Sequence, residues 1–175
     1  FAACHPVLAR EAQVALTLKV VGGLYTDAIA RLFLVPVPTM QQRIVRAKRA
    51  LAEAGVPFEV PPPAERPMRM AAVLGVLYLV FNEGYTATTG TQLVRAELTG
   101  EAIRLARELH RLVPGDGEVA GLLALMLLTD SRRAARTTPD GALVPLAEQD
   151  RSRWDSTLIA EGVAILLAAL AREAA

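Results

Sequence analysis

The residues best suited to acid–base or anion-binding chemistry lie in a charged block near the end of the sequence. Asp140 and Asp150, with Glu83 earlier in the chain, carry carboxylates that can act as general acids or bases. Arginines around Trp154, the single tryptophan, can hold an anion. The charged members of the block are Arg132, Arg133, Arg136, Asp140, Glu148, Asp150, Arg151, Arg153 and Asp155.

These residue types are compatible with catalysis, with a ligand site, or with ion pairs that fix a loop. The sequence has no glycine-rich phosphate loop before a helix, and Cys4, His5 and His110 do not have the spacing of a metal site. Paired carboxylates are common, and clustered charges are often structural. We therefore predict no enzyme activity, no cofactor and no metal, and we rank the structural interpretation above a ligand or partner site.

The structural interpretation gives two specific expectations. Trp154 should be largely buried between the last predicted helix and the helix that begins near Glu118. Arg151 should pair with at least one carboxylate, because an arginine among acids and beside a buried ring is costly to leave unpaired. The expected partners are Asp140, Asp155 or Glu83.

Residues 24–51 have the pattern of two short helices separated by a tight turn. Apolar residues recur at helical spacing from Ile29 to Leu34, which predicts one apolar face for the first helix. The Val-Pro-Val-Pro sequence at 35–38 ends that helix, because proline disfavours helical geometry in the residue before it. Thr39 has a suitable side chain for the N-cap of the second helix.

The second helix carries amide and basic side chains opposite an apolar stripe of Ile44, Ala47 and Leu51. A basic amphipathic helix after a tight turn is typical of a helix-turn-helix whose recognition helix enters the DNA major groove. The alternative is a solvated charged face, which is common for basic helices. Turn, cap, amides and arginines in one window favour DNA binding. The candidate DNA-binding residues are Thr39, Gln41, Gln42, Arg43, Arg46, Lys48 and Arg49.

The composition indicates a helical protein with a substantial hydrophobic core. The chain has 175 residues, of which 53% are hydrophobic, enough for one large domain or two small ones. Cys4 is the single cysteine, so no internal disulfide can form. No uninterrupted apolar run has membrane-spanning length. We therefore predict a cytoplasmic protein that does not contact a membrane.

The net charge of +1 conceals an uneven distribution. The first 56 residues contain seven Lys or Arg against three acidic residues, whereas the remainder contains 12 against 15. Polyanion binding is therefore expected in the first part of the chain.

The predicted fold class is all-α, in three parts. Residues 1–55 should form a three-helix helix-turn-helix domain, whose first helix, over 7–21, is closed by Gly22 and Gly23. Residues 56–67 are a proline-rich linker, expected to be extended and semi-rigid. Residues 68–175 should form a helical domain, tetratricopeptide-like in its packing, with a small irregular or hairpin insertion.

Within the last part the pattern predicts four helices. They are expected over 68–81, 101–113 (with Thr99 as its cap), 118–129 and 157–171. The last helix is hydrophobic nearly all round and is therefore expected to be buried. A turn at Pro139–Gly141 predicts pairing of 136–138 with 142–144. Asp155 or Ser156 should cap the last helix.

Residues 26–51 resemble region 4 of the bacterial extracytoplasmic-function sigma factors. The resemblance rests on Val35-Pro36 before the turn and on the sequence RIVRAKRAL at 43–51 after it. It implies that this region reads the −35 promoter element and docks on RNA polymerase. On this basis Thr39, Gln41, Gln42 and Arg43 face bases or phosphates, whereas Arg46, Lys48 and Arg49 hold phosphate or polymerase.

The second half resembles the tetratricopeptide-like extension of one subgroup of these factors. The matching sequences are NEGY at 82–85 and DGALVPLAEQDRSRWD at 140–155. The extension in that subgroup is required for sigma activity. The residues that this resemblance singles out, as a regulatory or structural motif, are Asn82, Glu83, Tyr85, Asp140, Gly141, Gln149, Asp150, Arg151, Trp154 and Asp155.

Two functions follow as expectations. The first is a fragment of a sigma factor that binds promoter DNA and the RNA polymerase core, with a regulatory protein or small ligand acting on the second domain. The second is a helical scaffold that binds a protein or ligand through 140–155 without reading DNA. The chain begins at Phe1 and stops after an apolar run, so we expect both ends to be cut. In the sigma-factor interpretation, region 2 is missing from these residues.

Overall fold

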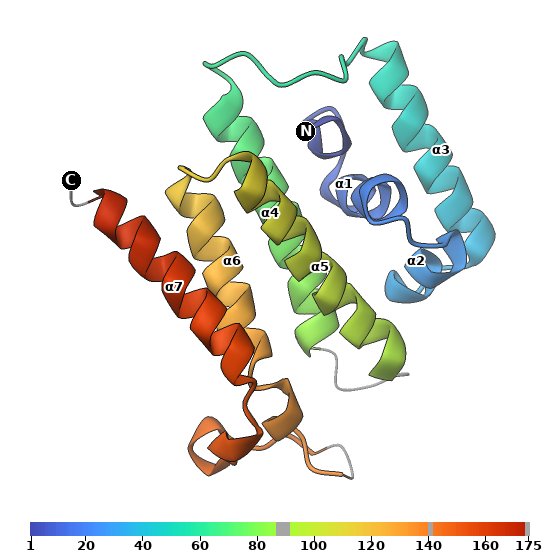
Figure 1. Cartoon of the computed structure of the whole chain (residues 1–175). Coiled ribbons are helices and arrows are strands. Elements are labelled where there is room, and N and C mark those ends of the chain that lie inside the picture. The colour runs from blue at the N-terminus through green and yellow to red at the C-terminus, as the bar shows by residue number, and fades with distance from the viewer. Residues whose placement is uncertain (87–91, 140–141, 174–175) are drawn as a thin grey trace. The chain divides into compact units, whose positions relative to one another are not determined.

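The computed structural model describes residues 1–86, 92–139 and 142–173, and within these ranges the fold is helical (Figure 1). The described residues form seven α-helices with short 3₁₀ segments and no β-strand. The predicted all-α class is confirmed. Contacts divide the chain into two compact units, Phe1–Glu83 and Gly84–Ala175.

The first unit is built around the packing of α3 against two shorter helices. Helix α1 spans Arg10–Leu16 and continues as a π-helical turn over Thr17–Val21. Helix α2 spans Thr26–Leu32 and α3 spans Val37–Glu53, and α3 packs on both α1 and α2. Their buried apolar side chains are Ala15, Leu16, Leu18, Ile29, Ala30, Met40, Ile44, Ala47 and Leu51.

The first helix begins three residues later than the sequence predicts. The Gln13 amide donates hydrogen bonds to the carbonyls of His5 and Leu8, and the Val7 N–H donates to His5 Nδ1. These contacts hold residues 5–9 as a loop, so the helix begins only at Arg10. Its predicted end is confirmed, because Gly23 has a φ of 71°, a conformation that glycine adopts without strain.

The turn between α2 and α3 has an unusual residue in its left-handed position. Leu34 has a φ of 51°, and its N–H donates to the Arg31 carbonyl while the Val35 N–H donates to the Ala30 carbonyl. This is the hydrogen-bond pattern of a Schellman motif, in which glycine is usual at the left-handed position. The motif ends α2 before the prolines at 36 and 38.

The prediction that Thr39 caps α3 is wrong. Helix α3 begins at Val37, with Pro36 as its N-cap, and the Met40 N–H donates to the Pro36 carbonyl over 3.1 Å. Pro38 is accommodated because the first helical residues need no N–H partner and the fixed φ of proline matches the helix. Thr39 therefore lies inside the first helical turn.

Four helices complete the fold. Helix α4 spans Arg66–Thr86, α5 spans Gln92–Leu112, α6 spans Gly117–Asp130 and α7 spans Ser156–Glu173. In the second unit, α6 packs on both α5 and α7, and Figure 1 shows α6 and α7 side by side. Gly162 allows this close approach, because a Cβ there would lie 3.0 Å from Leu128 Cγ.

Two expectations for the second unit need correction. Thr99 does not cap a helix, because α5 begins at Gln92 and Thr99 is fully buried within it. Threonine favours the N-cap position by its local chemistry. Here, however, the residues before Thr99 are themselves helical, so Thr99 lies inside the helix. The predicted hairpin is present as a single antiparallel bridge between Thr137 and Leu143, and its turn residues 140–141 lie outside the described ranges.

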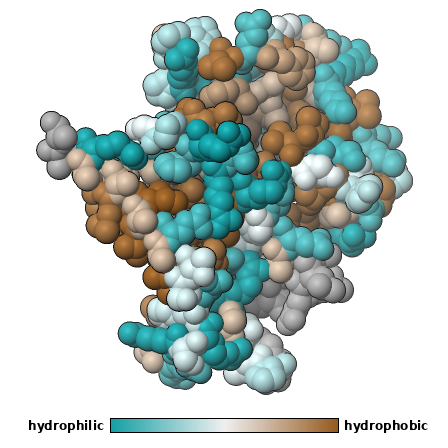
Figure 2. Space-filling model, in the orientation of Figure 1, coloured by the Kyte–Doolittle hydropathy of each residue, from teal (hydrophilic) through white to brown (hydrophobic). Residues whose placement is uncertain are grey.

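The prediction that the last helix is buried is wrong for one side of α7. Val163, Leu167 and Leu170 are 41%, 60% and 52% exposed, and Figure 2 shows hydrophobic side chains at the surface over this helix. The reason is that α6 covers one face of α7, the face that carries Gly162, and the apolar side chains on the other faces are left exposed.

Residues 54–65 contain turns and no helix, whereas Arg66 and Pro67 of the predicted linker belong to α4. However, the change from one compact unit to the other lies at Glu83, inside α4, and not in this segment. The three-part division at 1–55, 56–67 and 68–175 therefore stays a prediction.

Candidate nucleic-acid interface

Helix α3 has a buried face and an exposed face of different chemistry. Met40, Ile44, Ala47 and Leu51, spaced by three or four residues, are at most 6% exposed. This stripe anchors α3 on α1 and α2 and fixes which side chains face outward. The exposed candidate DNA-binding residues are Thr39, Gln41, Gln42, Arg46, Lys48 and Arg49.

Arg43 differs from the other candidates because it is half-buried beside the turn. Its guanidinium carbon lies 5.5 Å from the centroid of the Phe33 ring, a cation–π distance. Phe33 is the C-cap of α2, so the contact joins the two helices of the motif. The turn therefore restricts the orientation of Arg43.

Ion pairs reduce the free positive charge near this face. Arg49 Nε lies 2.6 Å from Glu53 Oε1, one turn further along α3, and both side chains are exposed. On α2, Arg31 donates to Asp27 over 2.9 Å, and this hydrogen bond lowers the pKa of the Asp27 carboxyl. Exposed pairs of this kind are weak, so Arg49 can exchange Glu53 for a phosphate at little cost.

Val45 is a residue of the exposed face that the sequence reasoning missed. It is 64% exposed on the outward side of α3, beside Gln42 and Arg49. Valine has no polar atom, so charged and amide side chains did not point to this position. The helical register, counted from Met40 and Ile44, would have placed it outward.

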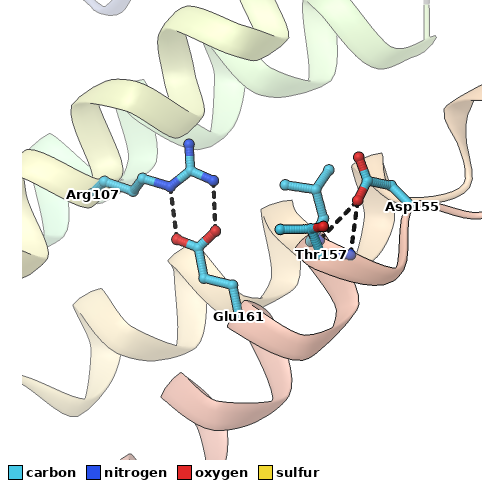
Figure 3. Close-up of polar contacts among 5 residues, drawn as sticks. Arg107, Asp155, Thr157 and Glu161 are labelled. Carbon is cyan, nitrogen blue, oxygen red and sulfur yellow. Dashed lines mark hydrogen bonds and ion pairs between the residues drawn. The ribbon is translucent and has the colours of Figure 1, made fainter.

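The second candidate site lies between α6 and α7, where Asp150 and Asp155 each close a turn. The Asp155 carboxylate accepts from the N–H groups of Thr157 and Leu158, so Asp155, one of the two predicted candidates, caps α7 (Figure 3). Asp150 accepts from the N–H and hydroxyl of Ser152, and these hydrogen bonds lower the pKa of its carboxyl. Both aspartates thus have structural contacts.

The predicted burial of Trp154 is only partly met. The residue is half-buried, and its Nε1 is buried without a hydrogen-bond partner. Gln149 Nε2 donates to the Val144 carbonyl, while its Oε1 is likewise buried without a partner. Buried polar atoms without partners are uncommon and call for an explanation.

The expected ion pair of Arg151 is absent from the described part of the second unit. Arg151 is exposed, and its guanidinium lies 5.5 Å from the Trp154 ring centroid. Asp155 serves as a helix cap instead, so its carboxylate is already used. Asp140 and Gly141 lie outside the described residues, and Glu83 belongs to the first unit.

Two contacts of the second unit were not expected from the sequence. Arg136 donates to the Tyr85 carbonyl, and its guanidinium carbon lies 3.9 Å from the Tyr85 ring centroid. Arg107 of α5 makes two hydrogen bonds to Glu161 of α7, of 2.7 and 2.6 Å (Figure 3). The Glu161 carboxylate raises the pKa of Arg107. No sequence spacing relates residues so far apart.

Asn82, the remaining residue of the predicted motif, is half-buried in the first unit.

Comparison with known protein families gives two matches, one in each half of the chain. Residues 1–51 match sigma-70, region 4, a non-enzymatic transcription-factor family that recognises the −35 element and acts with RNA polymerase. Residues 69–170 match a family of unknown function (DUF6596), and the chain belongs to this family. The two matches together support a factor of the sigma-70 family.

A relative is known in Rhizobium meliloti (strain 1021), an uncharacterized protein that is 48% identical over 166 residues. The alignment covers 95% of this chain and 39% of the relative, so the chain spans well under half of that protein. No solved structure matches the chain.

Two further features hold for the described residues. None of their helices combines the length and apolar character needed to cross a membrane. They contain no group of three or more His, Cys, Asp or Glu side chains arranged to hold a metal ion.

Proposed function

We propose that this chain is part of a sigma factor, in which the first unit reads the −35 promoter element for RNA polymerase. The observation that carries the proposal is the exposed amide and basic face of α3, presented by a helix-turn-helix within the region 4 match. A recognition helix of this kind enters the major groove, where amide and guanidinium groups bind base edges and phosphates.

The roles of the side chains follow from their places on α3. Thr39, Gln41 and Gln42 lie in the first two turns and are exposed, where recognition helices reach bases or phosphates. Arg43 reaches DNA from the flank beside Phe33. Arg46, Lys48 and Arg49 lie further along and bind phosphate or the polymerase.

In the same proposal the second unit is a regulatory extension of tetratricopeptide-like packing, of the kind found in one extracytoplasmic-function subgroup. Its three consecutive helices, each packed on the next, support this assignment. The protein then acts in the cytoplasm, with the RNA polymerase core as its partner. In this proposal residues 56–67 connect the DNA-reading part to α4, which leads into the extension.

A second candidate function is a binding site for a regulatory protein or small ligand in the segment 142–155. Gln149 Oε1 and Trp154 Nε1 favour it, because an acceptor and a donor are both buried there without partners. Trp154 is the single tryptophan, so its fluorescence reports directly on binding at this segment. Titration with RNA polymerase core or candidate ligands should shift its emission if the segment binds them.

The main proposal is tested by measuring duplex binding as a function of salt. Duplexes recovered from a randomized pool by the unaltered chain should lose affinity steeply with salt, by about 0.9 units of log–log slope per phosphate contact. Arg46→Ala should weaken binding. Arg111→Ala, which removes an exposed arginine of α5, is the matched control and should leave binding unchanged. Failure to recover any preferred sequence would contradict the proposal.

A further inference from the structure

The outward side of α3 presents four side chains in one row. Gln42, Val45, Arg46 and Arg49 are all exposed and are spaced i, i+3, i+4 and i+7. This row lies opposite the buried stripe of α3, so its side chains point away from α1 and α2. Homeodomains read bases in the major groove with side chains of this spacing on one helix, and here Gln42 and Val45 occupy the first two of these positions.

Val45 is the apolar member of this row. Because its side chain is 64% exposed, Val45 contributes little to the core of the first unit. A β-branched residue is also a weaker helix former than alanine. Single exposed apolar residues are common on protein surfaces, so exposure alone assigns no role. What distinguishes Val45 is its position on the outward side of α3, with Gln42 three residues before it and Arg49 four residues after it.

The chemistry of the major groove restricts what valine can recognise there. The base edges in this groove offer hydrogen-bond donors and acceptors and one apolar group, the C5-methyl of thymine. A valine side chain cannot form hydrogen bonds with the polar groups, but it can make a van der Waals contact with the methyl group. Its χ1 rotamer is nearly fixed in a helix, so little side-chain freedom is lost when the contact forms.

We propose that Val45 is a specificity-determining residue that reads the methyl group of a thymine in the promoter element. This inference rests on the proposed function, because it requires α3 to lie in the major groove. It goes beyond that function in naming an apolar contact and the base that it selects. A cytosine or a purine at the same position offers no equivalent apolar group.

The experiment compares thymine with deoxyuridine, which lacks only the methyl group. Each thymine of a duplex recovered from the randomized pool is replaced in turn, and affinity is measured with the full chain. We expect one replacement to weaken binding about fourfold, the value of one buried methyl group. In Val45→Ala the same replacement should have almost no effect, because the contact is already lost.

Two control variants separate this role from general effects. Lys48→Ala, on the flank of α3, should weaken binding of the thymine and the deoxyuridine duplex alike. The ratio of the two affinities should therefore stay the same. Val163→Ala changes an exposed helical valine of α7 and should alter neither affinity. Circular dichroism should show unchanged helix content in Val45→Ala, since alanine is the better helix former.

Each outcome decides a different question. If no thymine position distinguishes thymine from deoxyuridine, or if the distinction persists in Val45→Ala, the role of Val45 is overturned while DNA reading by α3 stands. If the unaltered chain recovers no preferred duplex at all, the proposed function itself fails. Loss of the distinction in Val45→Ala alone supports the inference.

Discussion

Arg43 and Lys48 lie on opposite flanks of α3, and their surroundings differ. Arg43 is half-buried against the Phe33 ring, whereas Lys48 is exposed without a described ion pair. A guanidinium with a restricted orientation suits a base edge, and a flexible ammonium suits a phosphate as a point charge.

We therefore expect Arg43→Ala to change which sequences are bound, with a loss of about 1–3 kcal/mol at one base position. Lys48→Ala should weaken all sequences alike and reduce the salt slope by about one unit. Phe33→Ala should reproduce part of the Arg43→Ala effect, because the ring orients the guanidinium. Binding to a promoter library measures all three. A uniform loss in both Arg43→Ala and Lys48→Ala would contradict the assigned roles.

Cys4 gives the first unit a pH-sensitive group. Its thiol is buried, 3.5 Å from the Thr17 hydroxyl, and burial raises its pKa above the ordinary value of 9.0. The folded thiol then keeps its proton at pH values where the unfolded thiol has lost it. The stability that the protonated thiol contributes is present below about pH 9 and is lost as the pH rises through the raised value.

We expect the urea midpoint of the unaltered chain to fall more between pH 8 and 10 than that of Cys4→Ala. Lysine and tyrosine titrations affect both proteins equally, so the difference between the two curves isolates Cys4. Parallel curves would show that the thiol does not titrate differently in the folded and unfolded states.

At the scale of elements, α6 and α7 are both apolar and differ in how they are covered. Leu127 of α6 is fully buried, because α6 contacts α5 on one side and α7 on another. Leu167 of α7 is 60% exposed. The same substitution at the two positions therefore removes different amounts of packing.

Leu127→Ala should lower the free energy of unfolding by about 2–5 kcal/mol, because it leaves a cavity. Leu167→Ala should cost less than about 1 kcal/mol, as expected of a surface substitution. Urea denaturation with equal m-values measures both. If the two losses are similar, the exposed face of α7 is covered in solution by a contact that the helices of this unit do not supply.

The helices themselves could be predicted, α3 from apolar residues at helical spacing and α6 and α7 from long apolar runs. The sequence narrows the cap of α7 to Asp155 or Ser156, and the structure shows that Asp155 serves. The start of α3 could not be predicted in this way, because Pro38 suits the first helical turn as well as the position before it. The pairing of Arg107 with Glu161 depends on how α5 and α7 pack, which sequence spacing does not encode. Val45 could be placed only by counting the register of α3.

At the scale of the whole molecule, the chain has two candidate boundaries with different physical origins. Contacts separate the units at Glu83, within the continuous helix α4. The family matches instead separate between residues 51 and 69, where the chain has turns and five prolines. Cleavage by a protease requires a local stretch of backbone to unfold, so the second boundary should be cut first.

Limited digestion with chymotrypsin should therefore cut first after Phe58, which is 87% exposed in the non-helical segment before α4. Phe81 should resist, because it is 2% exposed inside α4 and cleavage there would require the helix to open. Mass spectrometry of the earliest products identifies the site. Phe58→Ala should remove the early cut without changing the urea midpoint, since an exposed ring contributes little to stability. An early cut at Phe81, or at Tyr78 in the same helix, would place the flexible boundary within α4 and would contradict a linker at 56–67.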